Sequence, residues 1–232
     1  MINSERFKKT LADYDINLTQ LQLEQLELYA KILVEYNEKV NLTAITDSLG
    51  IENKHFLDSL LFAKSPLVKG SVADVGTGAG FPGIVAKIYK PDIDLTLIEP
   101  TGKRCVFLQY ALDTIGIKGT VVKERAEEAA RKGYREKYDL VTARAVAELR
   151  VLCEYCIPLV KLNGNFVAMK SEVPDEIINS KQAASKLGAK YMRVENFVLP
   201  DQSPRSLVVY FKNKATPDIY PRNGGKINKS PL

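Results

Sequence analysis

The sequence is poor in the residues on which several classes of protein depend. Its 232 residues include only three cysteines, an odd number that argues against a disulfide framework and fits a reducing compartment. No apolar run approaches the length of a membrane span, and the first residues contain no signal-peptide core. We therefore expect a cytoplasmic protein that does not enter a membrane, with a chain long enough to bury a substantial core.

Residues that could bind a metal are equally scarce. Cys153 and Cys156 form a single C-x-x-C pair inside a predicted helix, and His55 is the only histidine of the chain. A structural zinc site usually takes four cysteine or histidine ligands, and a thioredoxin-like pair stands at the start of a helix. The sequence therefore predicts no metal site and no thiol redox centre.

The excess of basic residues is small and is concentrated at one end. The chain has 33 Lys and Arg against 28 Asp and Glu, a net charge of +5, with a pI near 8.9. Between Phe211 and Leu232 five of these cations face a single acid, so +4 of that charge belongs to the C-terminal segment. An arm that contacts RNA and a solvated tail without a partner both remain open.

The chain is organised around the stretch from Val72 to Gly83, which is predicted to be a short buried strand, a glycine-rich turn and the start of a helix. Glycines let a ligand approach the backbone, and the helix N-terminus favours polar or anionic groups. The pattern Asp74-x-Gly76-x-Gly78-x-Gly80 matches the first motif of S-adenosylmethionine-dependent methyltransferases. Gly78-x-Gly80-x-x-Gly83 also matches the dinucleotide fingerprint, and a tight turn without a ligand is the third interpretation.

Residues 1–66 are predicted to be helical, in three helices at about Ser4–Tyr14, after Thr19, and at about Gly50–Lys64. Strands then follow at Val72–Val75, Asp94–Ile98, Gly119–Val122, Asp139–Ala143 and Asn165–Met169. Helices alternate with them at Pro82–Tyr89, Lys103–Ile115, Ala126–Lys132, Glu148–Val160 and Asp175–Leu187. Such alternation predicts a parallel sheet covered on both faces.

Two final strands at Tyr191–Leu199 and Ser206–Lys212 have no helix between them and must be antiparallel. A sheet that ends in this way favours a methyltransferase over a nicotinamide dehydrogenase, which would continue into a second domain. The predicted fold is therefore α/β, a Rossmann-like class I S-adenosylmethionine-dependent methyltransferase sheet with an antiparallel terminal strand. We divide the chain into an N-terminal helical cap (residues 1–66), a methyltransferase core (67–212) and a basic C-terminal arm (213–232).

Acidic residues follow the second and third strands. Glu99 can accept hydrogen bonds from both ribose hydroxyls of an adenosine group, or it can be a helix N-terminal acid stabilised by the macrodipole. After the third strand, Glu124, Glu127 and Glu128 are all candidates for adenine recognition, and a short solvated helix would explain them equally well. Spacing alone does not choose among these three.

Arg144 ends the fourth strand, next to the expected position of the transferred methyl group. The chain lacks the Asn/Asp-Pro-Pro-aromatic motif of exocyclic-amine methyltransferases at this point, and it lacks the Pro-Cys pair of enzymes that attack cytosine C5. A guanidinium stays protonated and cannot be a base. Arg144 could instead contact an RNA phosphate, a guanine edge or a carboxylate of the cofactor, or it could form a structural ion pair.

Several short motifs together resemble one family, the glucose-inhibited division protein B family of bacterial 16S rRNA guanine-N7 methyltransferases. The matching pieces are Asn41-Leu42-Thr43, His55-Phe56-Leu57-Asp58-Ser59, Asp74 through Gly83, Gly102-Lys103-Arg104, Arg125-Ala126-Glu127, Ala143-Arg144-Ala145 and the end from Tyr220 to Leu232. They extend from about residue 37 to the end of the chain. The resemblance implies S-adenosyl-L-methionine as cofactor and 16S rRNA or the small ribosomal subunit as partner. We expect a monomer.

The resemblance also implies roles for single residues. Family contacts with the cofactor fall on Gly76, Phe81, Ala126, Glu127 and Arg144, to which the glycine motif and the second strand add Gly78, Gly80 and Glu99. The candidate residues on the RNA side are Asn41, His55, Lys103, Arg104, Arg144, Lys170 and Arg205. Many members have Asp-Ser where this chain has Glu99-Pro100, which keeps the carboxylate but changes the turn.

Guanine N7 carries a free lone pair and no proton, so the implied reaction needs no general base and depends on alignment. We therefore expect His55 to position the substrate or support the helical cap. A methyltransferase of small molecules or proteins, and a non-catalytic module that binds RNA or an adenosine ligand, are the alternative functions.

Overall fold

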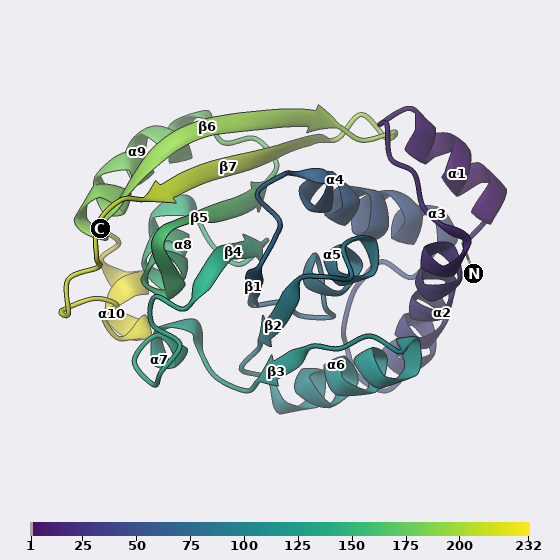
Figure 1. Ribbon diagram of the computed structural model, residues 1–232, viewed down its shortest axis with the longest axis horizontal. Coiled ribbons are helices and arrows are strands. Elements are labelled where there is room, and N and C mark those ends of the chain that lie inside the picture. Colours follow the sequence, from purple (N-terminus) through teal and green to yellow (C-terminus); the bar gives the residue numbers. More distant parts are fainter. Residues whose placement is uncertain (1) are drawn as a thin grey trace.

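The computed structural model of the protein describes residues 2–232 and has one seven-stranded sheet with helices on both faces (Figure 1). The strands are β1 (Ser71–Val75), β2 (Asp94–Ile98), β3 (Thr120–Val122), β4 (Tyr138–Arg144), β5 (Val160–Lys170), β6 (Ala189–Val198) and β7 (Pro204–Lys212). Their order is β3-β2-β1-β4-β5-β7-β6; β7 pairs antiparallel with both β5 and β6, and the other neighbouring strands pair in parallel. The predicted fold class is confirmed. The order reverses between β1 and β4, where ligands of such sheets bind at the carboxyl ends of the strands.

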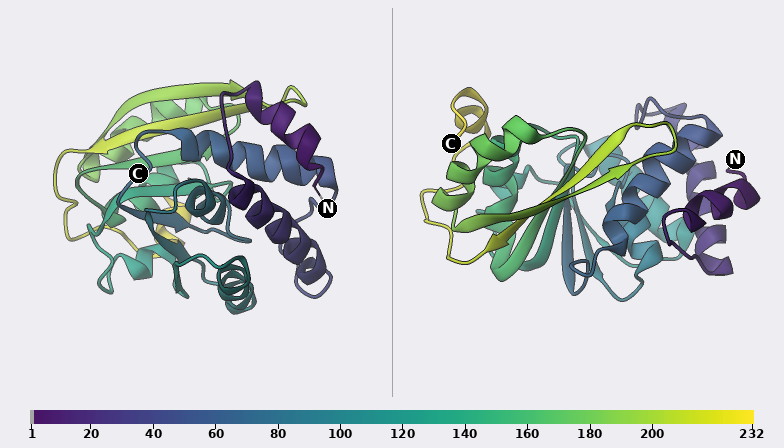
Figure 2. Two further views of the ribbon diagram at one scale, coloured as in Figure 1. Left: turned by 45° about the vertical axis from the view of Figure 1, so that its right-hand side comes forward. Right: turned by 90° about the horizontal axis from the view of Figure 1, so that it is seen from above.

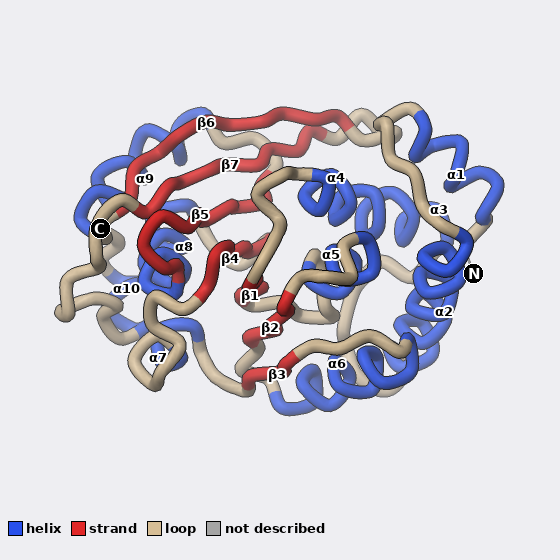
Figure 3. Tube along the Cα trace, in the orientation of Figure 1, coloured by secondary structure: helices blue, strands red, loops and turns tan. Residues whose placement is uncertain are grey.

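Helices cover the two faces of the sheet in two groups (Figures 1 and 3). One face carries α1 (Ser4–Ala12), α2 (Gln20–Asn37), α3 (Ser48–Gly50), α4 (Asp58–Lys64), α5 (Gly83–Tyr89) and α6 (Gly102–Ile115). The other face carries α7 (Ala126–Ala129), α8 (Leu149–Cys156), α9 (Pro174–Lys186) and α10 (Gly224–Lys229). Separate apolar clusters lie under the two groups, as expected for a sheet that is buried on both sides.

The helical cap shares its core with the sheet domain. Phe7, Leu26 and Phe56 belong to the same buried cluster as Phe107 and Leu112 of α6. The second helix begins after Thr19, as predicted, and Thr19 caps it: the Thr19 hydroxyl accepts from the Gln22 amide at 3.2 Å, and the Gln22 side chain accepts from the Thr19 amide. The Gln22 side-chain amide also donates to the carbonyls of Ile88 and Tyr89, at 3.1 Å each, so α2 packs against α5 and α6.

The third predicted helix is longer and less regular than its sequence indicates. It runs without a break from Ser48 to Lys64, and its middle part, Ile51–Leu57, is π-helical. Such widened turns often occur at functional sites because they change the direction of one group of side chains. Here the π-helical turns contain Lys54 and His55.

Two other predicted boundaries need correction. The helix expected over Glu148–Val160 ends as α8 at Cys156, is followed by a 3₁₀ turn at Ile157–Leu159, and Val160 already begins β5. Pro158 explains this end, because it has no N–H to continue a helix. The helix expected over Ala126–Lys132 ends at Ala129.

The terminal hairpin of β6 and β7 is antiparallel, as predicted, and its tip reaches the helical cap (Figure 2). The Tyr14 hydroxyl donates to the carbonyl of Val198 at 2.7 Å, and Lys54 forms an ion pair with Asp201 at 3.1 Å. The hairpin therefore joins the last strands to the first helices above the carboxyl ends of the parallel strands.

The C-terminal segment, residues 213–232, packs against α7 and α8, and not all of its charge is available to a partner. Arg222 forms an ion pair at 2.6 Å with Glu154, whose side chain is fully buried, and Lys212 is buried beside Glu136 at 2.8 Å. Two of the five cations between Phe211 and Leu232, Arg222 and the β7 residue Lys212, are therefore neutralised within the protein. Lys214, Lys226 and Lys229 are exposed. None of the helices in residues 2–232 is long and apolar enough to cross a membrane.

Candidate functional site

The glycine turn is held to the sheet by Asp74, at the end of β1. Its Oδ2 accepts from the Thr77 hydroxyl at 2.6 Å and from the Gly83 amide at 2.8 Å, which ties both ends of the turn to one buried carboxylate. Oδ1 is buried and has no hydrogen-bond partner among the described residues. Burial raises the pKa of Asp74 to about 6, although the bonds from Thr77 and Gly83 lower it.

The glycines of the turn differ in what surrounds them. Gly76, Gly78 and Gly80 all have φ between 61° and 99°, the left-handed region that favours glycine. A Cβ on Gly80 would collide with Ile84 and with the Tyr29 hydroxyl, whereas a Cβ on Gly78 would meet no atom within 4 Å. Gly80 therefore serves close packing, and Gly78 borders open space that a ligand can fill.

Glu99 lies beside Gly78, at the carboxyl end of β2. Its side chain is 2% exposed, and it accepts from the Gly78 amide at 3.1 Å and from the Thr101 amide at 2.9 Å. The carboxylate thus stays next to the glycine turn despite the unusual Pro100. Arg104, expected on the RNA side, approaches Glu99 to 3.9 Å, and the neighbouring Lys103 also lies in the first turn of α6.

The three acids after β3 have different surroundings. Glu124 pairs with Lys132 at 2.9 Å, which lowers its pKa, and Glu128 is exposed. Glu127 is 6% exposed, and Ala126 before it is also buried. Of the three candidates for adenine recognition, Glu127 is therefore the one that is buried, and it forms no ion pair with the described residues.

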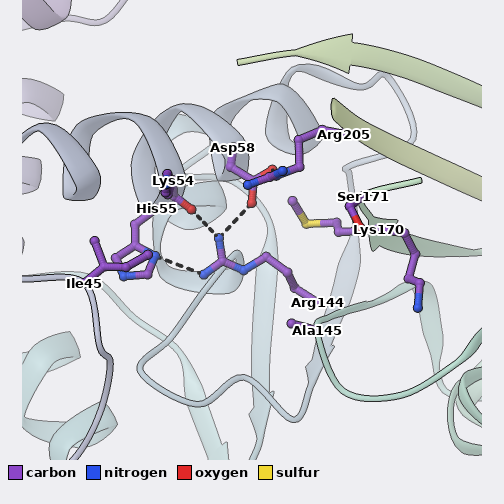
Figure 4. A pocket seen from close by; sticks show the side chains of 10 residues that line it. Ile45, Lys54, His55, Asp58, Arg144, Ala145, Lys170, Ser171 and Arg205 are labelled. Carbon is purple, nitrogen blue, oxygen red and sulfur yellow. Dashed lines mark hydrogen bonds and ion pairs between the residues drawn. The ribbon is translucent and has the colours of Figure 1, made fainter. Parts of the chain in front are cut away.

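A pocket of about 390 Å³ opens beside the turn, between the helical cap and the ends of β4 and β5 (Figure 4). It is lined by Ile45, Lys54, His55, Asp58, Arg144, Ala145, Met169, Lys170, Ser171 and Arg205. Four of the seven residues that the sequence placed on the RNA side therefore come together here: His55, Arg144, Lys170 and Arg205. Asn41, Lys103 and Arg104 do not line it, and Asn41 is exposed elsewhere on the cap.

Asp58 organises the arginines of this pocket. Its Oδ2 accepts from Arg144 at 2.9 Å, and its Oδ1 lies 3.2 Å from Nε of Arg205 (Figure 4). Arg144 also donates to the Lys54 carbonyl at 3.0 Å and stacks over the Phe81 ring, 5.1 Å from its centre. The Asp58 side chain is 6% exposed, so it balances both cations away from solvent.

Sequence reasoning did not select Asp58, although the residue lies in the quoted motif that begins at His55. The spacing was the available signal. Residues three apart on a helix face the same side, so this spacing could have shown that Asp58 faces the region that His55 faces.

His55 stacks on Phe81, the same ring over which Arg144 lies. Its ring lies 4.4 Å from that of Phe81 at 12°, with Nε2 at 2.9 Å from the Thr43 hydroxyl and Nδ1 at 3.4 Å from Arg144. A guanidinium only donates, so Nδ1 accepts and the proton lies on Nε2, which donates to Thr43. Burial and the nearby Arg144 charge lower the pKa of His55 to about 3, so the ring is neutral near pH 7.

Comparison with known proteins finds relatives along nearly the whole chain. The family model of rRNA small subunit methyltransferase G matches residues 22–206. The protein named Ribosomal RNA small subunit methyltransferase G from Halalkalibacterium halodurans is 46% identical over 232 residues, covering 97% of this chain and 98% of that protein. Its namesake from Bacillus subtilis is 44% identical over 237 residues, covering 100% and 99%.

Solved structures with low sequence identity share the fold. An S-adenosylmethionine-dependent O-methyltransferase from Thermotoga maritima has a TM-score of 0.53 at 14% identity, covering 80% of this chain and 73% of that one. A 16S rRNA (adenine(1408)-N(1))-methyltransferase from Catenulisporales acidiphilia has a TM-score of 0.53 at 14% identity, covering 72% and 93%. The fold is thus that of class I methyltransferases, and the match along nearly the whole chain shows that this protein belongs to the rRNA small subunit methyltransferase G family.

Proposed function

We propose that this protein transfers a methyl group from S-adenosylmethionine to N7 of a guanine in 16S rRNA of the small ribosomal subunit. One observation carries the proposal beyond family membership. A pocket lined by the cations Lys54, Arg144, Lys170 and Arg205 adjoins the aromatic end of the glycine turn, at the point where the strand order reverses. A purine that enters this pocket would lie next to the space above Gly78.

The residues around the turn fit the cofactor. The space in front of Gly78 can admit the part of the cofactor that lies against the backbone. The Glu99 carboxylate beside this space is suited to accept hydrogen bonds from the ribose hydroxyls. Ala126 and Glu127 would face the adenine. Phe81 and Arg144 would border the amino-acid part, close to the sulfonium that supplies the methyl group.

The chemistry asks little of the protein side chains. The N7 lone pair forms the new bond to carbon as the sulfur–carbon bond breaks, and the positive charge passes from sulfur to the purine, so no proton moves. His55 is neutral and uses its lone pair toward Arg144, and the arginines cannot accept a proton. The role of these residues is to align the base, which is the usual source of rate in such a reaction.

Cationic side chains around the pocket would bind the phosphates of the rRNA backbone. Lys54 and Arg205 stand on the side of the cap and hairpin, and Lys170, which pairs with Glu176 at 2.9 Å, stands at the end of β5. Phosphates that displace such ion pairs would make the affinity depend on salt. Asn41, Lys103 and Arg104 lie outside the pocket and would contact only RNA that extends beyond the target base. We expect a monomer that acts in the bacterial cytoplasm.

The test is transfer of labelled methyl from S-adenosylmethionine to small ribosomal subunits that lack the modification, followed by strand cleavage at 7-methylguanine. One labelled guanine in 16S rRNA would support the proposal. Label at an exocyclic amine, or label only in protein or small-molecule substrates, would contradict the proposal. The Arg144→Ala variant is the control, and we expect it to lose transfer to the same rRNA.

A further inference from the structure

The C-terminal segment reaches the predicted adenine side of the cofactor site. Figure 1 shows α10 beside α7 and α8, and its first residue, Gly224, lies against the side chain of Glu127. A Cβ built on Gly224 would overlap Oε1 of Glu127 and lie 3.3 Å from its Cδ. The neighbouring Gly225 differs, because a Cβ there would meet only Asn223 Oδ1, at 3.7 Å.

Gly224 is held in place on both sides. Before it, Arg222 makes four hydrogen bonds to Glu154, at 2.6 to 3.1 Å, and Arg131 donates to the Pro221 carbonyl at 2.7 Å. After it, Ile227 is fully buried. The backbone at Gly224 therefore cannot move away easily from a side chain that is pressed against it.

Glu127 is a largely buried acid that forms no ion pair with the described residues. Its side chain is 6% exposed, while Arg131 donates to a carbonyl and Lys132 pairs with Glu124 at 2.9 Å. The fully buried polar atoms that lack a hydrogen-bond partner in residues 2–232 do not include the Glu127 oxygens, so these oxygens border space that solvent or a ligand can enter. A carboxylate only accepts hydrogen bonds, and an exocyclic amine of a purine can donate to one that faces such a space.

We propose that Gly224 is a positioning residue of the cofactor site: by lacking a side chain, it leaves the Glu127 carboxylate in the orientation that accepts from the adenine amine. The inference rests on the proposed function, since it needs an adenosine cofactor at Glu127. It makes the C-terminal segment, which lies beyond the part matched by the family model, a wall of the cofactor site.

The test uses the full-length chain with Gly224→Ala, Gly225→Ala as matched control, and each combined with Glu127→Ala. Both alanines favour a helix to the same degree, so they differ mainly in the contact with Glu127. We expect Gly224→Ala to raise the Kd for S-adenosylhomocysteine and the KM for S-adenosylmethionine about tenfold, the loss of one hydrogen bond to a charged group. The kcat, the KM for rRNA and the melting temperature should stay close to those of Gly225→Ala.

In the Glu127→Ala background the Gly224 substitution should have no further effect. Equal affinities for the two glycine variants would overturn the inference, and so would a Glu127→Ala variant that binds as tightly as the unchanged protein. Neither result touches the proposed function, provided that the unchanged protein binds the cofactor. Failure of the unchanged protein to bind would overturn both together.

Discussion

The neutral state of His55 can be tested through protein stability, because no other histidine contributes. Its pKa is lowered to about 3 by burial and by Arg144, against an ordinary value near 6.5. As the pH falls below about 6.5, the unfolded chain takes up a proton that the folded protein refuses. The group therefore costs stability at low pH, increasingly from about pH 6.5 down to about pH 3.

The expected magnitude follows from the window between the two values. Each pH unit inside it costs about 1.4 kcal/mol, so going from pH 7.5 to pH 5 should cost about 2 kcal/mol through His55 alone. A His55→Gln variant has no such group. We expect its free energy of unfolding to fall by about 2 kcal/mol less than that of the unchanged protein over this range.

Urea unfolding at both pH values, for both proteins, measures this double difference and cancels the contributions of the carboxyl groups. A Thr43→Val variant is the control, because it removes the 2.9 Å partner of Nε2 but keeps the buried imidazole, and it should retain the pH dependence. If His55→Gln and the unchanged protein lost the same stability, within about 0.5 kcal/mol, the ring would be protonated in the fold and the argument for a neutral positioning residue would fail.

Three further substitutions test other parts of the site. Asp58→Asn leaves two arginines without their shared carboxylate. We expect a loss of about 3 kcal/mol in the free energy of unfolding and a methyl-transfer rate lower by about 100-fold. An unchanged transfer rate would show that the placement of these arginines does not matter for catalysis. Gly78→Ala and Gly116→Ala both place a Cβ at positive φ with no atom within 4 Å, so both should lower the free energy of unfolding by the same amount. Only Gly78→Ala should weaken S-adenosylmethionine binding, by at least about tenfold in calorimetry. Arg222→Ala should cost about 3 kcal/mol in urea unfolding because it leaves a buried carboxylate unpaired, while Lys226→Ala, on the exposed side of the same segment, should stay within about 0.5 kcal/mol.

Local patterns were enough to predict the sheet, because its elements follow short-range rules. The strand Asp94–Ile98 was predicted with the bounds it has in the structure, and the missing helix between the last two strands was enough to make them antiparallel. Boundaries failed where one residue interrupts a pattern, as Pro158 does in the helix after β4.

The pocket was only partly predictable, because its residues meet through the tertiary fold. Arg144 and Lys170 could be located at strand ends, where parallel strands converge. Local patterns did not indicate the π-helical turn around His55, nor that the predicted hairpin would bring Arg205 to Asp58 across the top of the sheet. The burial of Arg222 against Glu154 was equally hidden, since the two residues are far apart in the chain.

The most direct test of the central claim is methyl transfer to small-subunit rRNA in which the target guanine is replaced by 7-deazaguanine. This base keeps the shape and the Watson–Crick edge of guanine but has carbon in place of N7. We expect full transfer to guanine and none to the replacement, with both RNAs bound equally well. Equal transfer to the two RNAs would contradict methylation at N7, and with it the conclusion that this site works by alignment of a lone pair without a general base.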